Sequence, residues 1–149
     1  MAGGKKVPIL TQYICGALIK QINDIMEKNA NNALRGEDLT ISQSGVLMLL
    51  DQKEDKTATF KDLEKRFGVS QPTMAGILSR LEQKKLVEFL SDPDDKRIRR
   101  AKLTGKGMDK CREGYKHMKS AEEFLLGSLT AEEKQEFLRL LIKIRNNMD

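Results

Sequence analysis

The stretch from Phe67 to Thr104 constrains the fold of this 149-residue chain more than any other. A turn at Gly68 leads into an amphipathic helix, and two strand-like segments follow, separated by Asp92-Pro93-Asp94-Asp95. Ser70 suits the N-cap of the helix, and the Asp and Pro residues between the strand segments favour a turn. With a short helical pattern just before it, this order predicts a helix-turn-helix followed by a β-hairpin wing.

The helix expected over residues 70–85 has two distinct faces. One carries an apolar stripe at the spacing of a buried helix face, namely Met74, Ile77, Leu78 and Leu81. The other carries small or neutral polar residues, namely Gln71, Thr73, Ala75, Gly76, Ser79 and Gln83, with Arg80 on the flank. Such a face fits close approach to DNA bases, and it fits an ordinary solvated helix equally well.

The hairpin favours the DNA interpretation. Five basic residues lie within seven positions, namely Lys96, Arg97, Arg99, Arg100 and Lys102, and Lys106 follows. A basic hairpin beside a helix suits phosphate contacts and insertion into the minor groove. A charge run that only aids solubility would not explain this place in the chain. The net charge of +5 permits binding to nucleic acid but does not require it.

Helices are expected on both sides of this region. A stripe of apolar residues predicts a helix over residues 8–32, weakened at Asn29–Asn32, with Gly36 in a polar connection and residues 1–7 as an irregular lead. A long helix is expected to start at Thr104 and to end at Gly127. Composition agrees, since only 5% of residues are aromatic and three are proline, which favours a mainly helical protein.

Capping signals place the remaining elements. Thr40 and Gln43 form a capping box that opens a short, buried helix, and Thr130 and Glu133 form another that opens the last helix. Residues 57–59 suit a very short strand. Fold class is therefore mainly α with a small β-hairpin, a winged helix-turn-helix flanked by N- and C-terminal helices.

The hairpin and its surroundings resemble the MarR family of winged helix-turn-helix transcriptional regulators. Asp95-Lys96-Arg97, five residues and then Leu103-Thr104 match that family's D-x-R-x5-L-T wing signature. The stretches 67–73 and 81–87 are similar to its turn, recognition-helix start and recognition-helix end. The resemblance implies one MarR-like domain over residues 1–149, with a winged module at 40–104 and dimerisation helices at 8–32 and 105–148.

By that resemblance, the chain is a homodimeric regulator of transcription that binds a pseudo-palindromic operator in double-stranded DNA, as a repressor. Arg97 would enter the minor groove, oriented by Asp95 together with Arg80, and the start of the helix at Gln71 would approach the major groove. The residues that we expect at the DNA are Ser70, Gln71, Pro72, Thr73, Ser79, Arg80, Asp95, Lys96, Arg97 and Arg99.

The chain departs from the family pattern at two places. Lys85 stands where members often have glycine, so the end of the recognition helix is expected to differ locally. Ala75 and Gly76 stand near a position that often carries a longer polar or basic side chain. Sequence specificity would then depend on Gln71, Thr73, Ser79 and the wing.

The resemblance also implies a small aromatic or phenolic ligand that modulates release from DNA. Candidate walls for its pocket are Tyr13, Met26, Leu34 and Met48, which fit a plain core as well. An alternative is a thiol-based redox sensor of the same fold that uses Cys15, although we expect this residue to be a small buried hydrophobe. Cys111 lies on the apolar stripe of its helix and suits such a role less.

Other functional classes fit the sequence poorly. His117 is the single histidine, and no nucleophile motif or phosphate-binding glycine loop accompanies it, so we expect neither an enzyme nor a cofactor. Asp92, Asp94 and Asp95 lack the alternating oxygen ligands and the closing Glu of a calcium loop. No signal peptide or membrane-length apolar run occurs, which predicts a cytoplasmic protein without membrane contact.

Overall fold

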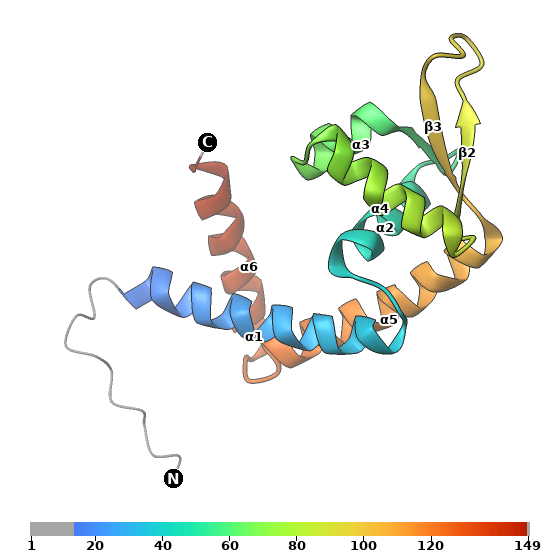
Figure 1. Cartoon of the computed structure of the whole chain (residues 1–149). Helices are drawn as coiled ribbons and strands as arrows, with labels where there is room; N and C mark the ends of the chain where they lie inside the picture. Colours follow the sequence, from blue (N-terminus) through green and yellow to red (C-terminus); the bar gives the residue numbers. More distant parts are fainter. Residues whose placement is uncertain (1–13, 149) are drawn as a thin grey trace.

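The computed structural model describes residues 14–148 of the chain. The elements are α1 (Ile14–Gly36), α2 (Ile41–Gln52), β1 (Thr57–Thr59), α3 (Phe60–Phe67), α4 (Gln71–Gln83), β2 (Val87–Ser91), β3 (Arg99–Leu103), α5 (Gly105–Leu126) and α6 (Ala131–Asn146). In Figure 1, the β2–β3 hairpin rises beside α3 and α4, while α1 and α5 run below them. The predicted winged helix-turn-helix fold is confirmed.

The wing belongs to a small antiparallel sheet with the strand order β1-β3-β2. Strand β3 pairs with β2 from Val87↔Leu103 to Ser91↔Arg99, and the short β1 pairs with its other edge. The sequence pattern predicts these strands over residues 86–90 and 98–103, and both begin one residue later. Along β3, Ala101 and Leu103 are buried, so Arg99 shares their face while Arg100 lies on the opposite one.

The core of the module lies between the helix-turn-helix, α2 and the sheet. Its largest fully buried side chains come from every one of these elements and from α5: Val46, Leu47, Leu50, Leu63, Met74, Leu78, Leu81, Leu86, Val87 and Cys111. The predicted capping box at Thr40 is present and opens α2, and Ser70, Thr104 and Thr130 cap later helices as expected. Thr59, at the end of β1, caps α3. The core therefore holds α4 and the hairpin on one rigid base.

The N-terminal helix differs from the prediction. Within the described residues it continues through Asn29–Asn32 to Gly36, because each Asn costs only a few tenths of a kcal/mol in a helix. The left-handed turn falls at Asp38 (φ 55°), where the backbone N–H of Leu39 bonds to the carbonyl oxygen of Leu34. Gly36 is thus helical and not part of a connection. Residues 1–7, Pro8 and Tyr13 lie outside the described residues.

The recognition helix α4 ends without glycine. Lys85 adopts the left-handed conformation (φ 63°), and the N–H of Leu86 bonds to the carbonyl oxygen of Leu81 at 3.0 Å. This pattern ends many helices and normally has glycine at the left-handed residue. Gly68 is the left-handed residue that ends α3, with φ 61°. The helix end that the family resemblance put in question therefore keeps the usual geometry, with a lysine in the strained position.

The flanking helices leave apolar side chains uncovered in this single chain. Of the described residues, α6 buries none and α1 buries only Leu34. The exposed large apolar residues of these two helices are Leu18, Ile19, Ile22, Ile25, Leu138, Leu140, Leu141, Ile142 and Ile144. Figure 1 shows α6 rising from the crossing of α1 and α5, apart from the winged module.

Candidate nucleic-acid interface

The start of α4 is built by a local hydrogen-bond pattern. The Ser70 hydroxyl accepts a bond from the backbone N–H of Thr73 at 3.3 Å and lies 3.0 Å from the Thr73 hydroxyl. Pro72 occupies the first turn, where no N–H is needed. Gln71, Pro72 and Thr73 are all exposed, so the first turn offers polar side chains and a positive helix end to a neighbouring anion.

The outer face of α4 is open at its centre. Ala75, Gly76 and Ser79 are exposed, and a Cβ added to Gly76 would meet nothing within 4 Å. A glycine inside a helix costs roughly 0.5–1 kcal/mol relative to alanine. Nothing inside the described part of the chain requires glycine here. A partner that approaches the helix backbone closely, as a DNA groove does, would require it.

The wing tip presents an arginine held by a carboxylate. Asp95 accepts bonds from the Arg97 backbone N–H at 3.0 Å and from Nε and Nη2 of its guanidinium, both at 3.1 Å. The Arg97 side chain hydrogen bond to Asp95 holds the pKa of this carboxyl below its usual range. The side chain of Arg97 is nevertheless 90% exposed. Asp95 therefore orients the guanidinium without covering it.

The other arginines of the basic run have internal contacts. Arg100 donates to Asp92 at 3.1 Å and to the Thr57 hydroxyl at 2.9 Å, and only 25% of its side chain is exposed. Arg99 places its guanidinium carbon 4.8 Å from the ring centroid of Phe60 and 5.1 Å from that of Phe89. Lys96 remains exposed at the tip. The basic run is thus divided between the tip and the stem of the hairpin.

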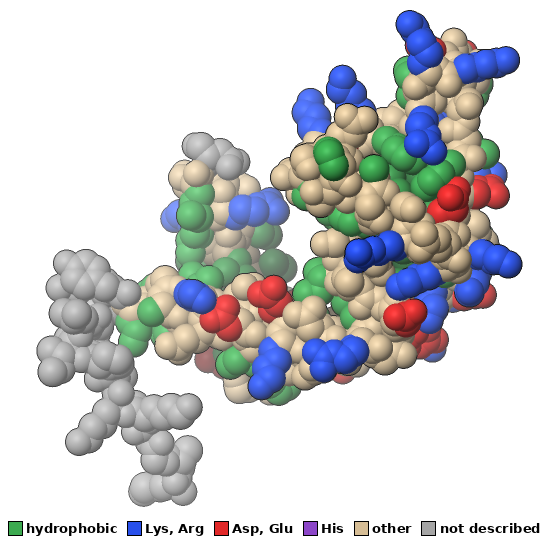
Figure 2. All heavy atoms as spheres, viewed as in Figure 1, with side chains coloured by type: hydrophobic (Ala, Val, Ile, Leu, Met, Phe, Trp, Pro, Cys, Tyr) green, Lys and Arg blue, Asp and Glu red, His purple; other side chains and the backbone are tan. Residues whose placement is uncertain are grey.

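A groove of about 660 Å³ lies between the hairpin and the helix-turn-helix. Gln71, Arg97 and Arg99 line it together, so the structure brings these three predicted residues into one site. Lys61 of α3 lines it too, a residue that sequence reasoning missed although it lies on the first helix of the motif. Figure 2 shows Lys and Arg side chains at the hairpin tip and above the helix-turn-helix, with apolar side chains between them.

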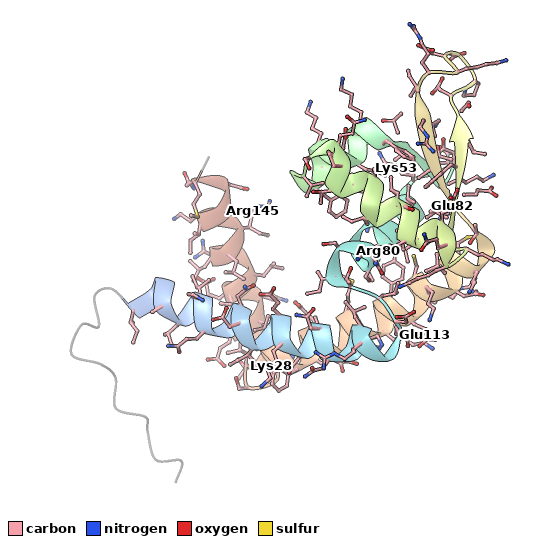
Figure 3. All side chains as sticks on the ribbon, in the orientation of Figure 1. Lys28, Lys53, Arg80, Glu82, Glu113 and Arg145 are labelled. Carbon is pink, nitrogen blue, oxygen red and sulfur yellow. The ribbon has the colours of Figure 1, made fainter. Side chains whose placement is uncertain are left out.

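The other seven predicted residues do not line this groove, and two of them lie toward the far end of α4. Ser79 and Arg80 occupy the C-terminal half of α4, and both are exposed. Figure 3 shows Arg80 on the side of α4 that faces away from the hairpin tip. Among the described residues Asp95 orients Arg97 and Arg80 makes no ion pair with Asp95, so a part for Arg80 in orienting Arg97 stays a prediction.

A second cavity, of about 430 Å³, lies between α1, α2 and α5. Its lining is mostly apolar and contains no Lys, Arg, Asp or Glu: Met26, Asn29, Ala30, Ala33, Leu34, Ile41, Ser44, Gly45, Met48, Gly114, His117, Met118, Ser120, Ala121 and Phe124. Three of the predicted walls, Met26, Leu34 and Met48, are among them. The fourth, Tyr13, lies outside the described residues.

One polar atom in the wall of this cavity lacks a partner. The Nε2 atom of His117 is buried and finds no hydrogen-bond partner in the described part of the chain. It lies 3.9 Å from the Glu37 carboxylate, which is already bonded to Lys110 at 2.9 Å. The Lys110 hydrogen bond holds the pKa of Glu37 below its usual range. The sequence offered His117 only as the single histidine of the chain, whereas the structure places it on the cavity wall.

The two cysteines differ in access. Cys15 is exposed in this chain, so the prediction that it is buried is wrong: α1 leaves that turn uncovered. Cys111 is buried between α5 and the core, and burial raises the pKa of its thiol to about 11. A thiol with such a pKa is almost entirely protonated at neutral pH and is a poor nucleophile.

Two other kinds of feature are absent within residues 14–148. No group of three His, Cys, Asp or Glu side chains there is placed to hold a metal ion. Asp92 instead accepts the Asp94 backbone N–H at 2.9 Å, which agrees with the predicted turn role. No helix in that range combines the length and apolar content needed to cross a lipid bilayer.

Comparisons with known proteins agree with this geometry. The sequence model of the MarR family matches residues 37–98, from the end of α1 to the hairpin tip. The uncharacterized HTH-type transcriptional regulator YdgJ of Bacillus subtilis is 25% identical over 147 residues, which covers 98% of this chain and 89% of that protein.

Solved structures give the same result over most of the chain. The structure of MepR from S. aureus in complex with DNA has a TM-score of 0.78 and 25% identity, covering 90% of this chain and 98% of that one. The apo form of MarR from E. coli has a TM-score of 0.76 and 28% identity, covering 94% of this chain and 98% of that one.

Proposed function

We propose that this chain, a transcriptional regulator of the MarR family with a winged helix-turn-helix fold, is a repressor that binds a pseudo-palindromic operator as a homodimer. The observation that carries the proposal is the exposed Arg97, held by Asp95 at the hairpin tip beside the open face of α4. The similarity to MepR, whose structure contains DNA, supports it further.

Each subunit would read DNA with two elements. Arg97 would enter the minor groove, where an arginine reads groove width and potential more than base identity. The first turn of α4 would meet the major groove, with Ser70 and its helix end near a phosphate and with Gln71 and Thr73 near base edges. Lys96 at the wing tip and Lys61 would contact phosphates. Because the outer face of α4 has no long side chain at Ala75 and Gly76, shape readout would carry much of the specificity.

The test of DNA binding compares two arginines that differ in place but not in chemistry. Arg97→Ala removes an arginine paired with Asp95 at the wing tip, and Arg112→Ala removes one paired with Asp109 on α5. Both variants change the net charge by the same amount. A duplex enriched from a random pool by the wild-type chain serves as the probe. We expect Arg97→Ala to weaken binding at least tenfold, a loss of about 1.4 kcal/mol, and Arg112→Ala to leave it within twofold.

Salt dependence separates DNA binding from a module that contacts only proteins. Each phosphate neutralised contributes about −0.9 to the slope of log K against log salt concentration. We expect a steep slope for the wild-type chain and a shallower one for Lys96→Ala. A flat profile for the wild-type chain, together with unchanged affinity in Arg97→Ala, would remove the wing from the function.

The uncovered faces of α1 and α6 support the homodimer. Leu138 on α6 is 58% exposed and Ile19 on α1 is 56% exposed, which is unusual for large apolar residues clustered on two helices. A second copy of the chain would bury both faces around a two-fold axis. Two winged modules related by that axis would face half-sites about one helical turn apart, or a multiple of it.

Light scattering with size-exclusion chromatography tests the dimer. Leu138→Glu places a charge on the exposed apolar face, whereas Lys143→Glu, five residues farther along, places a glutamate on a different, exposed face of α6. We expect the first to shift the mass from dimer to monomer and to lose operator affinity, and the second to stay dimeric. A wild-type chain that is monomeric at micromolar concentration would refute the assignment.

The cavity between α1, α2 and α5 supports release of DNA by a small ligand. Its walls join the flanking helices to the winged module, so an occupant would contact both parts. A lining without charged side chains suits an uncharged aromatic or phenolic molecule. Such a ligand lowers DNA affinity only if it binds the released form more tightly, and a tenfold effect needs about 1.4 kcal/mol of difference.

A cavity-filling variant tests the site. Ala121 lines the cavity, and Ala121→Phe would occupy part of its volume. A phenolic compound found by thermal-shift screening should stabilise the wild-type chain and release it from DNA, and should do neither in Ala121→Phe. Equal responses in both chains would place ligand binding elsewhere.

Redox sensing stays as the alternative because Cys15 is exposed. Mass spectrometry after mild hydroperoxide treatment would show a sulfenate or a disulfide at Cys15, accompanied by loss of DNA affinity. An unmodified Cys15 with unchanged affinity would exclude this alternative.

A further inference from the structure

We propose that Arg99 is a positioning residue: its guanidinium, stacked on Phe60 and Phe89, fixes the hairpin against α3 and so sets where Arg97 meets DNA. The inference rests on the proposed DNA binding. It assigns Arg99 a different part from the direct DNA contact expected from the sequence.

The contact joins α3 to the hairpin near the wing tip. Phe60 is the first residue of α3 and Phe89 is the middle residue of β2. The two rings lie edge to face, with centroids 5.0 Å apart and planes at 72°. The Arg99 guanidinium lies within 5.1 Å of both centroids. One cation thus contacts both an aromatic ring of the helix and one of the hairpin.

The strand register puts Arg99 at the point where the hairpin leaves the sheet. Arg99 pairs with Ser91 in the last step of the β2–β3 ladder, and the chain beyond that step forms the tip. Arg97 lies two residues farther out. Beyond the last pair, the backbone N–H of Asp92 still donates to the carbonyl oxygen of Ile98 at 2.8 Å, so the tip is bonded directly to the stem. A rotation of the stem at the last pair therefore moves the Arg97 guanidinium with it.

The two neighbouring arginines hold opposite faces of the stem. Side chains alternate along a strand, so Arg99 faces the rings and α3 while Arg100 faces Asp92 and Thr57. An ion pair holds one face and an aromatic stack holds the other. Arg97, Arg99 and Gln71 line the same groove, so the stack also sets the distance from the wing to the first turn of α4.

The chemistry requires arginine and not only a positive charge. A planar guanidinium can stack on a ring and still offer N–H groups at its edge, whereas the lysine ammonium is a compact, strongly hydrated charge. A direct phosphate contact would accept either residue. Arg99→Lys therefore separates the two roles, since it keeps the charge and removes the planar stack.

The decisive test is a double-mutant cycle between Phe60 and Arg97, measured as affinity for the tightest-binding duplex of about three helical turns recovered from a random pool. Phe60→Leu removes the ring on α3 and leaves the charges unchanged. We expect Phe60→Leu and Arg99→Lys to weaken binding by about 3- to 30-fold. Arg97→Ala should then cost little in either background, because Arg97 is already misplaced.

A matched control separates positioning from general destabilisation. Phe67→Leu makes the same chemical change at the other end of α3, where the ring packs beneath Gly45 of α2. We expect it to lower the urea midpoint while leaving the cost of Arg97→Ala at its wild-type value. A change of fold stability alone cannot produce coupling to Arg97 in one case and none in the other.

The outcomes distinguish the two proposals. If Arg97→Ala costs nothing in the wild-type background, the proposed use of the wing fails. If Arg97→Ala keeps its full cost in Phe60→Leu and Arg99→Lys, DNA binding stands and the positioning role is overturned. It is also overturned if Arg99→Lys binds like wild type while Arg99→Gln lowers the salt slope by about one phosphate contact.

Discussion

Replacing Lys85 by glycine is expected to stabilise the protein. Lys85 is the left-handed residue after the recognition helix, with φ 63°. Its side chain is exposed and makes no ion pair or hydrogen bond among residues 14–148. Its backbone N–H donates to the Glu82 carbonyl oxygen at 2.9 Å, and its carbonyl oxygen accepts from the Thr104 hydroxyl at 2.7 Å. Glycine keeps that carbonyl and both helix-ending hydrogen bonds. The substitution therefore removes backbone strain without removing a contact.

The magnitude follows from two opposing contributions. A non-glycine residue in the left-handed region costs roughly 1–2 kcal/mol because Cβ crowds the following carbonyl. Glycine loses about 0.4–1 kcal/mol more conformational entropy on folding. The difference is a net gain of about 0.5–1 kcal/mol, which corresponds to a rise in Tm of about 1–4 °C for a domain of this size.

Urea unfolding at one fixed protein concentration measures the effect, because a dimer's apparent stability depends on concentration. Gly68→Ala is the matched reverse experiment: Gly68 has φ 61° and open space around its Cβ position, so only strain is added. We expect the two variants to shift the midpoint in opposite directions with the slope unchanged. DNA affinity should stay constant in Lys85→Gly.

A lower midpoint for Lys85→Gly, measured beside the expected loss for Gly68→Ala, would refute the reasoning. It would mean that the strain assigned to φ 63° is not present in solution, or that the lysine side chain stabilises the helix end. A change in the slope m would instead indicate a change in the unfolded state.

Three further predictions concern stability. Gly107→Ala should destabilise by about 1–3 kcal/mol in thermal unfolding, because a Cβ there would lie 2.2 Å from the Leu86 carbonyl oxygen. The backbone N–H of Asp94 holds the pKa of Asp92 below its usual range. The contribution of the Asp92 carboxylate to folding stability is therefore present above about pH 4 and is lost as pH falls through the depressed pKa. Asp92→Asn should make the loss of stability in acid less steep. Burial raises the pKa of Tyr115 to about 12. The contribution of the neutral Tyr115 phenol to folding stability is therefore present below about pH 10 and is lost as pH rises toward 12. Tyr115→Phe should make the loss of stability at alkaline pH less steep.

Local signals in the sequence were sufficient for most of the fold. The capping residues Thr40, Thr59 and Ser70 each accept a hydrogen bond from the backbone N–H three residues on, so their chemistry can be read without knowing the tertiary structure. The same holds for Gly68 and for the Asp95–Arg97 pair, whose partners are two residues apart. Features that depend on neighbours in sequence were therefore predictable.

Features that depend on distant residues were not. The sequence presents Arg97, Arg99 and Arg100 as one basic run, and only the fold separates them, by bringing Phe60 to one face of β3 and Thr57 to the other. Strand alternation indicated that Arg99 and Arg100 lie on opposite faces of β3, but it did not indicate which side chains pack against each face. The asparagines of α1 show that a weak local propensity need not end a helix, because each costs only a few tenths of a kcal/mol.

The position of the cavity gives the proposed regulation a physical basis. Met118 and Phe124 of α5 line it and are 56% and 65% exposed in the single chain, so its rim lies near the apolar faces that the proposed dimer would cover. Met48 of α2 forms the opposite wall and contacts α5 at Gly114, where a Cβ would lie 2.4 Å from the Met48 methyl group. Such close packing leaves little freedom for α2 and α5 to move independently. A ligand that separates them would tilt the winged module relative to the dimer helices, and the two Arg97 side chains would then no longer match both minor grooves at once.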